Sequence, residues 1–244
     1  SDENPTPTVG FAIREPNRVS AWFSDSLSVR EIVQPEQSFV EVKPDTYPWR
    51  CFGKLVVQWP SYPPTEASAT LVDESWILTA GHAVYREERG GWATAATFLQ
   101  GVEDSRTARQ RSVIAVELCV LSGWVNEEAN DADLAFVRLH SEAKGHGIGQ
   151  VAGWLGLAGY DDDRQLVHRN INAVGYPTGS LQPLYSKGVI ESVSDRMLLH
   201  SANTKKGWSG AALWTVHNRL PIVVGLHTAF DYIQNLNAST RFTS

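Results

Sequence analysis

The chain has 244 residues, of which 42% are hydrophobic and 20% are charged, and its formal net charge at pH 7 is −6. These proportions are those of an ordinary globular protein, and the length suits one domain of two β-barrels, which commonly takes about 200–250 residues. The acidic balance argues against a nucleic-acid or anionic-membrane partner. No apolar run approaches the roughly 20 residues needed to span a bilayer.

Residues 1–31 are polar, contain proline and show little periodicity. We interpret this segment as an N-terminal extension, either a pro-segment that is removed or a permanent surface arm. The chain opens with Ser1 and has no apolar signal segment, so we expect it to be a processed form of a secreted protein.

Short apolar runs separated by turn residues begin at about Trp49 and predict β-strands. The first group comprises residues 52–57, 69–72, 76–79, 113–118 and 134–139. A glycine-rich connection follows, and the second group comprises residues 170–175, 185–193, 197–200, 211–215 and 222–227. No convincing long amphipathic helix is present. Two groups of short strands predict an all-β protein with two lobes.

One histidine directly follows a predicted strand, in the segment Thr79-Ala80-Gly81-His82. This position lets the side chain leave the strand on a tight turn and point into a cleft. An imidazole can accept a proton near neutral pH, which is what activation of a hydroxyl nucleophile requires. The chain has seven histidines, and an isolated one is more often structural, so His82 needs support from other residues.

Two aspartates lie just before the apolar run 134–137 and are candidates to orient this imidazole. A carboxylate at the start of a strand can be buried there and accept the Nδ1–H of the histidine, which selects its tautomer and stabilises the imidazolium. Asp133 abuts the apolar run, whereas Asp131 lies in a polar turn. We favour Asp133, with Asp131 as the alternative.

Ser209 lies between glycines in the segment Gly207-Trp208-Ser209-Gly210. A serine is a weak nucleophile until a base takes its proton. The glycines allow a sharp turn that aims the N–H groups of Gly207 and Ser209 at one point, as an oxyanion hole requires. An α/β-hydrolase would place its serine in Gly-x-Ser-x-Gly, whereas here Ala211 follows Gly210.

In the chain order His, Asp, Ser, these segments resemble the chymotrypsin-like peptidases, and among them the bacterial and fungal glutamyl endopeptidases. The motifs that carry the resemblance are Tyr47-Pro48-Trp49-Arg50, Thr79 to His82, Ser122-Gly123-Trp124, Asp133-Leu134-Ala135, Val174-Gly175-Tyr176-Pro177, Ser186-Lys187-Gly188, Gly207 to Gly210 and Gly225-Leu226-His227-Thr228. The resemblance covers about residues 32–244. It implies two six-stranded antiparallel β-barrels, of about residues 50–142 and 160–244, with the active site in the cleft between them.

The resemblance implies a serine endopeptidase with Ser209 as nucleophile, His82 as general base, Asp133 as orienting acid and the amides of Gly207 and Ser209 as oxyanion hole. We expect no cofactor and no metal, a protein or peptide substrate, and a monomer. The rival reading is a chymotrypsin-fold binding protein without turnover. The intact triad argues against it, and Trp208 mildly favours it, because trypsin-like zymogens place an aspartate there.

In glutamyl endopeptidases, a histidine on the strand after the nucleophile and a Thr or Ser five residues before it bind the acidic side chain of the substrate. His227 and Thr204 occupy these positions. A charged or hydrogen-donating imidazole can pair with a carboxylate, and the hydroxyl can donate a second hydrogen bond to it. Asn203 stands where trypsin-like enzymes bind Lys or Arg through an aspartate, and Lys205 and Lys206 add positive charge nearby. The resemblance therefore implies cleavage after Glu or Asp. Gln remains an alternative, because picornaviral main proteases read glutamine with a Thr and a His.

Relatives begin their mature chain at a position that corresponds to Ile32. We therefore expect a zymogen that loses residues 1–31, by self-processing after Glu31 or by a trypsin-like cut after Arg30. If the segment is instead a permanent arm, the intact chain is the active form.

Cys51 and Cys119 allow at most one internal disulfide, and their spacing fits no metal motif. The sequence leaves open whether they are bonded. Many animal relatives carry a disulfide beside the catalytic histidine, and the resemblance places Ala67 and Ala83 at its two positions. A small apolar pair thus replaces the bridge.

Overall fold

A computed structural model describes residues 39–104, 106, 111–141, 147–160 and 162–242. The N-terminal segment 1–31 and its expected cleavage site at Glu31 lie outside these residues. Within the described ranges, strands dominate and helices are short.

The first barrel is a closed ring of six strands in which every neighbouring pair is antiparallel. Its order is β2 (Phe52–Gln58), β3 (Thr65–Leu71), β4 (Trp76–Thr79), β9 (Ala135–Leu139), β8 (Ser112–Val120) and β7 (Ala95–Gln100). In β7, Ala96, Phe98 and Gln100 are buried and the residues between them are more exposed. This two-residue period is that of a strand with one face in the core.

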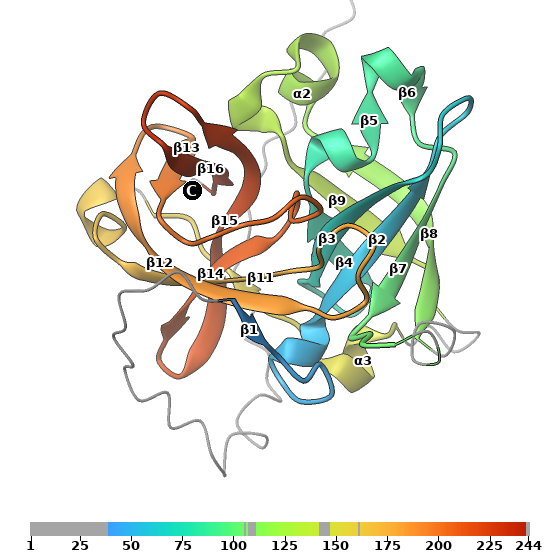
Figure 1. Ribbon diagram of the computed structural model, residues 1–244, viewed down its shortest axis with the longest axis horizontal. Helices are drawn as coiled ribbons and strands as arrows, with labels where there is room; N and C mark the ends of the chain where they lie inside the picture. Colours follow the sequence, from blue (N-terminus) through green and yellow to red (C-terminus); the bar gives the residue numbers. More distant parts are fainter. Residues whose placement is uncertain (1–38, 105, 107–110, 142–146, 161, 243–244) are drawn as a thin grey trace, which may run out of the picture.

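The second barrel closes in the order β11 (Asn170–Gly175), β12 (Leu184–Val193), β13 (Met197–His200), β16 (Leu236–Arg241), β15 (Leu220–Asp231) and β14 (Ala212–His217). Its neighbouring strands are antiparallel. Two short strands are added outside the ring, β1 (Val40–Glu41) beside β12 and β10 (Gly156–Leu157) parallel to β15. Figure 1 shows the two barrels as lobes lying side by side.

Short helices and one small hairpin connect the strands. They are η2 (Trp49–Cys51), η3 (Gly81–Ala83), the hairpin of β5 (Tyr85–Arg86) and β6 (Gly91–Trp92), η4 (Glu87–Arg89), α2 (Ser122–Glu127), η5 (Asn130–Ala132), α3 (Gly149–Ala152) and η6 (Asp163–Gln165). In the described part of the chain, no helix has the length and apolar character to cross a membrane.

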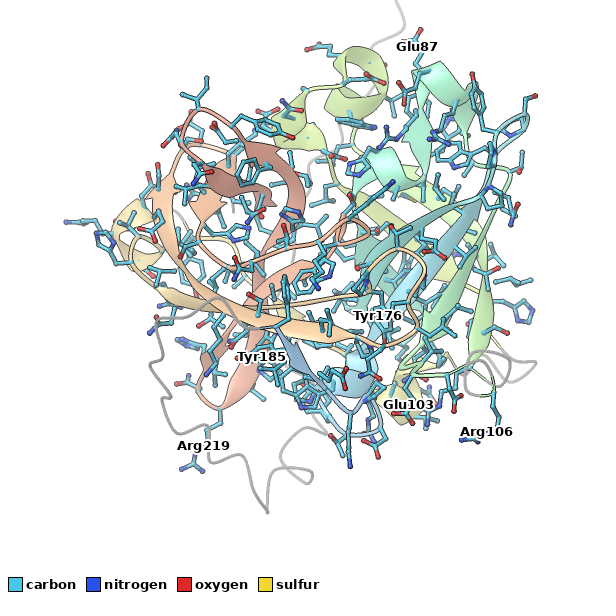
Figure 2. The ribbon with its side chains drawn as sticks, in the orientation of Figure 1. Glu87, Glu103, Arg106, Tyr176, Tyr185 and Arg219 are labelled. Atoms are coloured by element: carbon cyan, nitrogen blue, oxygen red, sulfur yellow. The ribbon has the colours of Figure 1, made fainter. Side chains whose placement is uncertain are left out.

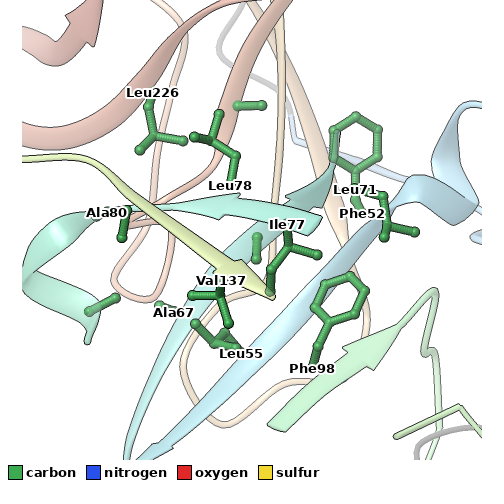
Figure 3. Packing of buried hydrophobic residues seen from close by; sticks show 14 of the residues in the cluster. Phe52, Leu55, Ala67, Leu71, Ile77, Leu78, Ala80, Phe98, Val137 and Leu226 are labelled. Carbon is green, nitrogen blue, oxygen red and sulfur yellow. The ribbon is translucent and has the colours of Figure 1, made fainter. Parts of the chain in front are cut away.

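The larger of the two hydrophobic cores extends from the first barrel into the second. Figure 3 shows Leu55 and Leu78 of the first barrel packed in one cluster with Leu226 of β15. The smaller core lies within the second barrel and includes Trp208. Because burial of apolar surface drives folding, this shared core holds the two barrels together and fixes the residues that lie between them.

The predicted fold class, two six-stranded antiparallel barrels, is confirmed. The apolar pattern does not predict β7 or β16, because polar residues such as Thr97 and Asn237 interrupt their apolar runs. The two cysteines, whose pairing the sequence leaves open, are both free thiols, and Cys51 is buried.

Candidate active site

His82 and Asp133 meet at the ends of two neighbouring strands of the first barrel. His82 lies in η3, just after β4, and Asp133 lies just before β9. Because Thr79 of β4 pairs with Ala135 of β9, both segments leave the sheet at the same edge. His82 Nδ1 lies 2.6 Å from Asp133 Oδ2, and the His82 backbone N–H donates to Asp133 Oδ1 at 2.7 Å. The carboxylate therefore fixes both the ring and the backbone of the histidine.

Asp133 is only 4% exposed, as expected for a carboxylate that abuts an apolar run. Asp131, the alternative from the sequence, lies in η5 and has no hydrogen bond to His82 among the described residues. The ring of Trp124 packs beside His82, with 6.1 Å between ring centroids. Asp133 rather than Asp131 thus contacts the imidazole.

The loop that carries Ser209 precedes β14 and depends on two glycines in the left-handed region. Gly207 has φ +97° and Gly210 has φ +83°, values that other residues rarely adopt. A Cβ on Gly210 would overlap the Ser68 carbonyl oxygen. Within the described structure, the N–H groups of Gly207 and Ser209 donate to no protein group. They are therefore available to a ligand, as an oxyanion hole requires.

Trp208 anchors this loop in the smaller core. Its side chain is fully buried, and Phe39 packs against it edge-on with 5.5 Å between ring centroids. Packing of a large aromatic side chain is a strong anchor. The tryptophan therefore holds the loop, so its presence does not favour the reading of a silent binding protein.

Ser209, His82 and Gly207 open onto one cavity of about 640 Å³. Its walls come from both barrels, with Val56 and Ala67 on one side and Thr178 and Ser209 on the other. The three candidate residues of the triad are thus brought together from three distant parts of the chain.

A sequence model of the trypsin-like peptidase domain matches residues 67–226, a span that contains His82, Asp133 and Ser209. The chain belongs to the trypsin-like peptidase family. The peptidase is accordingly a serine endopeptidase, as predicted from the sequence. No curated protein matches the chain significantly in sequence.

Solved structures of serine proteases share the fold of the peptidase. A Glu endopeptidase in complex with MPD gives a TM-score of 0.72 at 22% identity and covers 86% of this chain and 93% of its own. The protease Anisep from Arthrobacter nicotinovorans gives 0.67 at 16% identity, with 80% and 91% covered. A thermostable serine protease from an extremophilic microorganism gives 0.63 at 19% identity, with 80% and 92% covered. At sequence identities this low, the similarity to these structures shows a common fold.

Thr204 is bound to a residue of the peptidase that the sequence does not single out, Asn237. Thr204 Oγ1 lies 2.7 Å from Asn237 Oδ1, and Asn237 Nδ2 donates to the Ala202 carbonyl at 2.9 Å. A carbonyl oxygen only accepts, so the amide nitrogen faces Ala202 and the Thr204 hydroxyl donates to Oδ1. The hydroxyl expected to donate to substrate is therefore turned toward Asn237, and its lone pairs remain as acceptors.

His227 is buried beside a second histidine, His200, with 5.8 Å between ring centroids and 80° between ring planes. Burial, followed by the nearby His82, lowers the pKa of His227 to about 4. Burial, followed by His227, holds the pKa of His200 well below its usual value. Both rings are therefore neutral at pH 7, so His227 carries a single N–H and no full positive charge.

Ser68 is a second residue that the sequence does not single out, and it ties the two barrels of the peptidase together beneath the site. Its hydroxyl donates to the Gly207 carbonyl at 2.9 Å and accepts from the Tyr176 amide at 2.9 Å. Its own amide donates to the Ser209 carbonyl at 2.8 Å. Figure 2 shows Tyr176 at the junction of the lobes. A lone serine in a strand is too common to signal such a role.

Proposed function

We propose that Ser209, His82 and Asp133 are the catalytic triad of this endopeptidase. The observation that carries the proposal is the position of His82, with its Nδ1 2.6 Å from Asp133 Oδ2 and its ring in the wall of the cavity that contains Ser209. Asp133 accepts the Nδ1–H, which leaves Nε2 unprotonated and able to accept the Ser209 proton.

In this mechanism, Ser209 Oγ attacks the carbonyl carbon of the scissile bond while His82 Nε2 takes the hydroxyl proton. The oxyanion that forms is bound by the amides of Gly207 and Ser209, and one such donor is worth about 3 kcal/mol. His82 then protonates the leaving amine, and the acyl group stays on Ser209. Water attacks this ester as His82 takes its proton, which releases the acid product and restores the serine.

We infer that the enzyme cuts after glutamate. His227 supplies an uncharged N–H donor, and Asn203 offers no acid to bind a Lys or Arg side chain. Fold likeness to a Glu endopeptidase is in keeping with this inference. A glutamate carboxylate can also draw a proton onto His227 as it binds, because a bound anion raises the pKa of the imidazole.

Glutamine is the second candidate, and the bond between Thr204 and Asn237 favours it. With its proton committed to Asn237 Oδ1, Thr204 presents only lone pairs. The amide of a Gln side chain can donate to these lone pairs, whereas a Glu carboxylate cannot. Binding of glutamate then requires that Thr204 rotate and leave Asn237 Oδ1 without its donor, at a cost of about 1–3 kcal/mol.

Cleavage of four peptides that differ only in Glu, Gln, Asp or Lys before the cut bond tests these assignments. We expect cleavage after Glu, and a fall to background in Ser209→Ala, since removal of a nucleophilic serine costs about 10⁶-fold. If His227 protonates on binding glutamate, kcat/KM for Glu relative to Gln falls as the pH rises from 5.5 to 8.5. Equal cleavage by Ser209→Ala refutes the triad, and a preference for Lys refutes the proposed pocket.

We further propose that the enzyme acts outside the cell, as a monomer, on protein or peptide substrates. The proposal rests on the family resemblance and on the acidic composition, with a net charge of −6. Sedimentation of the purified chain tests the monomer.

A further inference from the structure

The cavity beside Ser209 extends away from the residues proposed to bind the acyl side of the substrate. Among the described residues that line it are Glu66, Arg89 and Lys206, but neither Thr204 nor His227. An endopeptidase holds its substrate on both sides of the scissile bond. The half of the cleft that lacks the acyl pocket therefore receives the leaving group.

The acidic residue in the wall of this cavity is already neutralised. Glu66 Oε2 lies 2.7 Å from Lys54 Nζ and accepts from the Gly179 amide at 2.6 Å. Lys54 is almost completely buried and also donates to the Ser180 carbonyl at 2.9 Å. Glu66 therefore supports the wall of the cavity and contributes little net charge to it.

Two cations in the wall, Arg89 and Lys206, have no carboxylate partner among the described residues. The Arg89 guanidinium lies 5.4 Å from the ring centroid of Trp59 and 5.6 Å from that of Tyr62. Aromatic faces, rather than an acid, hold it in place, and its Nε has no hydrogen-bond partner there. The neighbouring Lys205 does not line the cavity, and its Nζ lies over the ring of Phe39, 4.4 Å from the centroid.

Arg86 also lines the cavity, but its positive charge is partly neutralised by a neighbouring carboxylate. Its Nε donates to the His82 carbonyl at 2.9 Å, and its guanidinium lies 3.0 Å from Glu88. Within the described structure, the cavity thus carries positive charge from Arg89 and Lys206 that no carboxylate pairs, in a chain whose net charge is −6.

We propose that Arg89 and Lys206 make the leaving-group side of the cleft selective for acidic side chains. This inference rests on the proposed endopeptidase function and adds a second specificity site to it. An Asp or Glu just after the cut bond meets two cations that no carboxylate of the described chain neutralises, whereas a Lys or Arg meets like charge. Peptides with acidic residues after the scissile bond are therefore the preferred substrates.

Quenched fluorescent peptides with one constant acyl half and Asp-Asp, Ser-Ser or Lys-Lys after the cut bond test the proposal in the full chain. We expect kcat/KM to fall in that order, with about tenfold between the extremes, the scale of one charge-assisted hydrogen bond. Arg89→Gln and Lys206→Gln each reduce this ratio, and Arg89→Lys largely retains it. The ratio also shrinks at high salt, because ions screen partly exposed charges.

Arg164→Gln is the matched control, because it removes the same charge from a side chain that is 90% exposed on the second barrel. It should leave the ratio unchanged. Equal kcat/KM for Asp-Asp and Lys-Lys, or an equal fall of the ratio in Arg164→Gln and Arg89→Gln, overturns the proposal.

Binding to Ser209→Ala separates this proposal from the proposed function. We expect a labelled tetrapeptide with a free amino terminus and two aspartates to bind at least several-fold more tightly than its lysine counterpart, and Arg89→Gln to remove the difference. This result supports the proposed selectivity of the cavity for acidic side chains even if the wild-type chain cleaves no peptide. Equal binding of the two peptides refutes it even if the chain cleaves after glutamate.

Discussion

At the scale of single residues, His200 and His227 place two ionisable rings inside the second barrel. His200 is 0% exposed, and neither of its ring nitrogens has a hydrogen-bond partner in the described structure. A buried cation without a partner is costly, so both rings stay neutral. Their neutrality makes His227 an uncharged donor beside the proposed acyl pocket and ties the stability of the fold to pH.

We expect acid to destabilise the protein through these two rings. A histidine in the unfolded chain has a pKa near 6.5, whereas that of folded His227 is about 4. Between these values the unfolded chain binds protons that the folded chain does not, so stability present above pH 6.5 is lost as the pH falls toward 4. For His227 the loss is about 3 kcal/mol. Urea unfolding at several pH values measures it.

His200→Gln removes one of the two groups, so its free energy of unfolding should fall less steeply between pH 6.5 and 4. The matched control is His217→Gln, which removes an exposed imidazole. If the slope in His200→Gln equals that of the wild type, the pair does not govern the acid response.

At the scale of elements, the loop from Gly207 to Gly210, which carries the proposed catalytic Ser209, is held by contacts with three neighbouring parts of the structure. Trp208 enters the smaller core, the Gly210 amide donates to the His227 carbonyl at 2.8 Å, and Ser68 binds the Gly207 carbonyl. These contacts hold the loop, while Gly207 and Ser209 line the cavity and their amides donate to no protein group in the described structure. Preorganised donors of this kind need no rearrangement when charge develops.

Gly210→Ala should disrupt this loop, because the new Cβ overlaps the Ser68 carbonyl and the Thr79 hydroxyl in a left-handed backbone. The backbone strain alone costs roughly 1–2 kcal/mol. We expect a lower melting temperature and at least a tenfold loss of kcat.

Gly90→Ala is the control for the backbone effect, since Gly90 has φ +87° but its nearest neighbour, Pro60 Cγ, would lie 4.0 Å from the new Cβ. This variant should lower the free energy of unfolding only by the cost of the strained backbone. Equal losses of stability in the two variants would show that the close approach at Gly210 is unimportant.

At the scale of the whole molecule, the active site depends on the seam between the barrels. The larger core crosses this seam, and Ser68 of the first barrel binds both Gly207 and Tyr176 of the second. In the other direction, the Thr240 hydroxyl of β16 shares its one proton between the Asn130 carbonyl at 3.3 Å and the Asp133 carbonyl at 3.4 Å. Each barrel therefore contacts segments of the other that carry proposed catalytic residues, so the proposed site needs both barrels.

Ser68→Ala should weaken the seam and the catalytic loop together. It leaves the buried Gly207 carbonyl and Tyr176 amide without a partner, at a cost of about 1–3 kcal/mol. We expect kcat to fall more than KM rises, because the oxyanion loop moves while the acyl pocket remains. Denaturant unfolding and steady-state kinetics measure the two effects.

Thr70→Val is the matched control in the same strand. Thr70 is 0% exposed and its hydroxyl has no hydrogen-bond partner in the described structure, so its loss should cost little. If Ser68→Ala behaves like Thr70→Val in both measurements, the seam does not depend on the Ser68 hydroxyl.

The sequence offered His82 and Asp133 as candidates through local patterns, a strand end and an apolar run, supported by chain order and by the family resemblance. Ser68, His200 and Asn237 could not be predicted, because their roles come from contacts across the chain. Ser68 and Gly207 are 139 positions apart, and Thr204 and Asn237 are 33 apart. Nothing in a single buried serine or asparagine indicates which distant group it will meet.

The sequence by itself determined the all-β class and the two lobes, since these depend on short-range periodicity and turn residues. It offered three candidate catalytic residues through their flanking residues, chain order and the family resemblance. Tertiary structure alone decided that the Thr204 hydroxyl donates to Asn237, that His227 is neutral, and that Arg89 and Lys206 line the cavity with no carboxylate partner among the described residues. Hydrogen-bond direction, protonation and local charge depend on burial and on which distant groups meet. Those are properties of the folded chain.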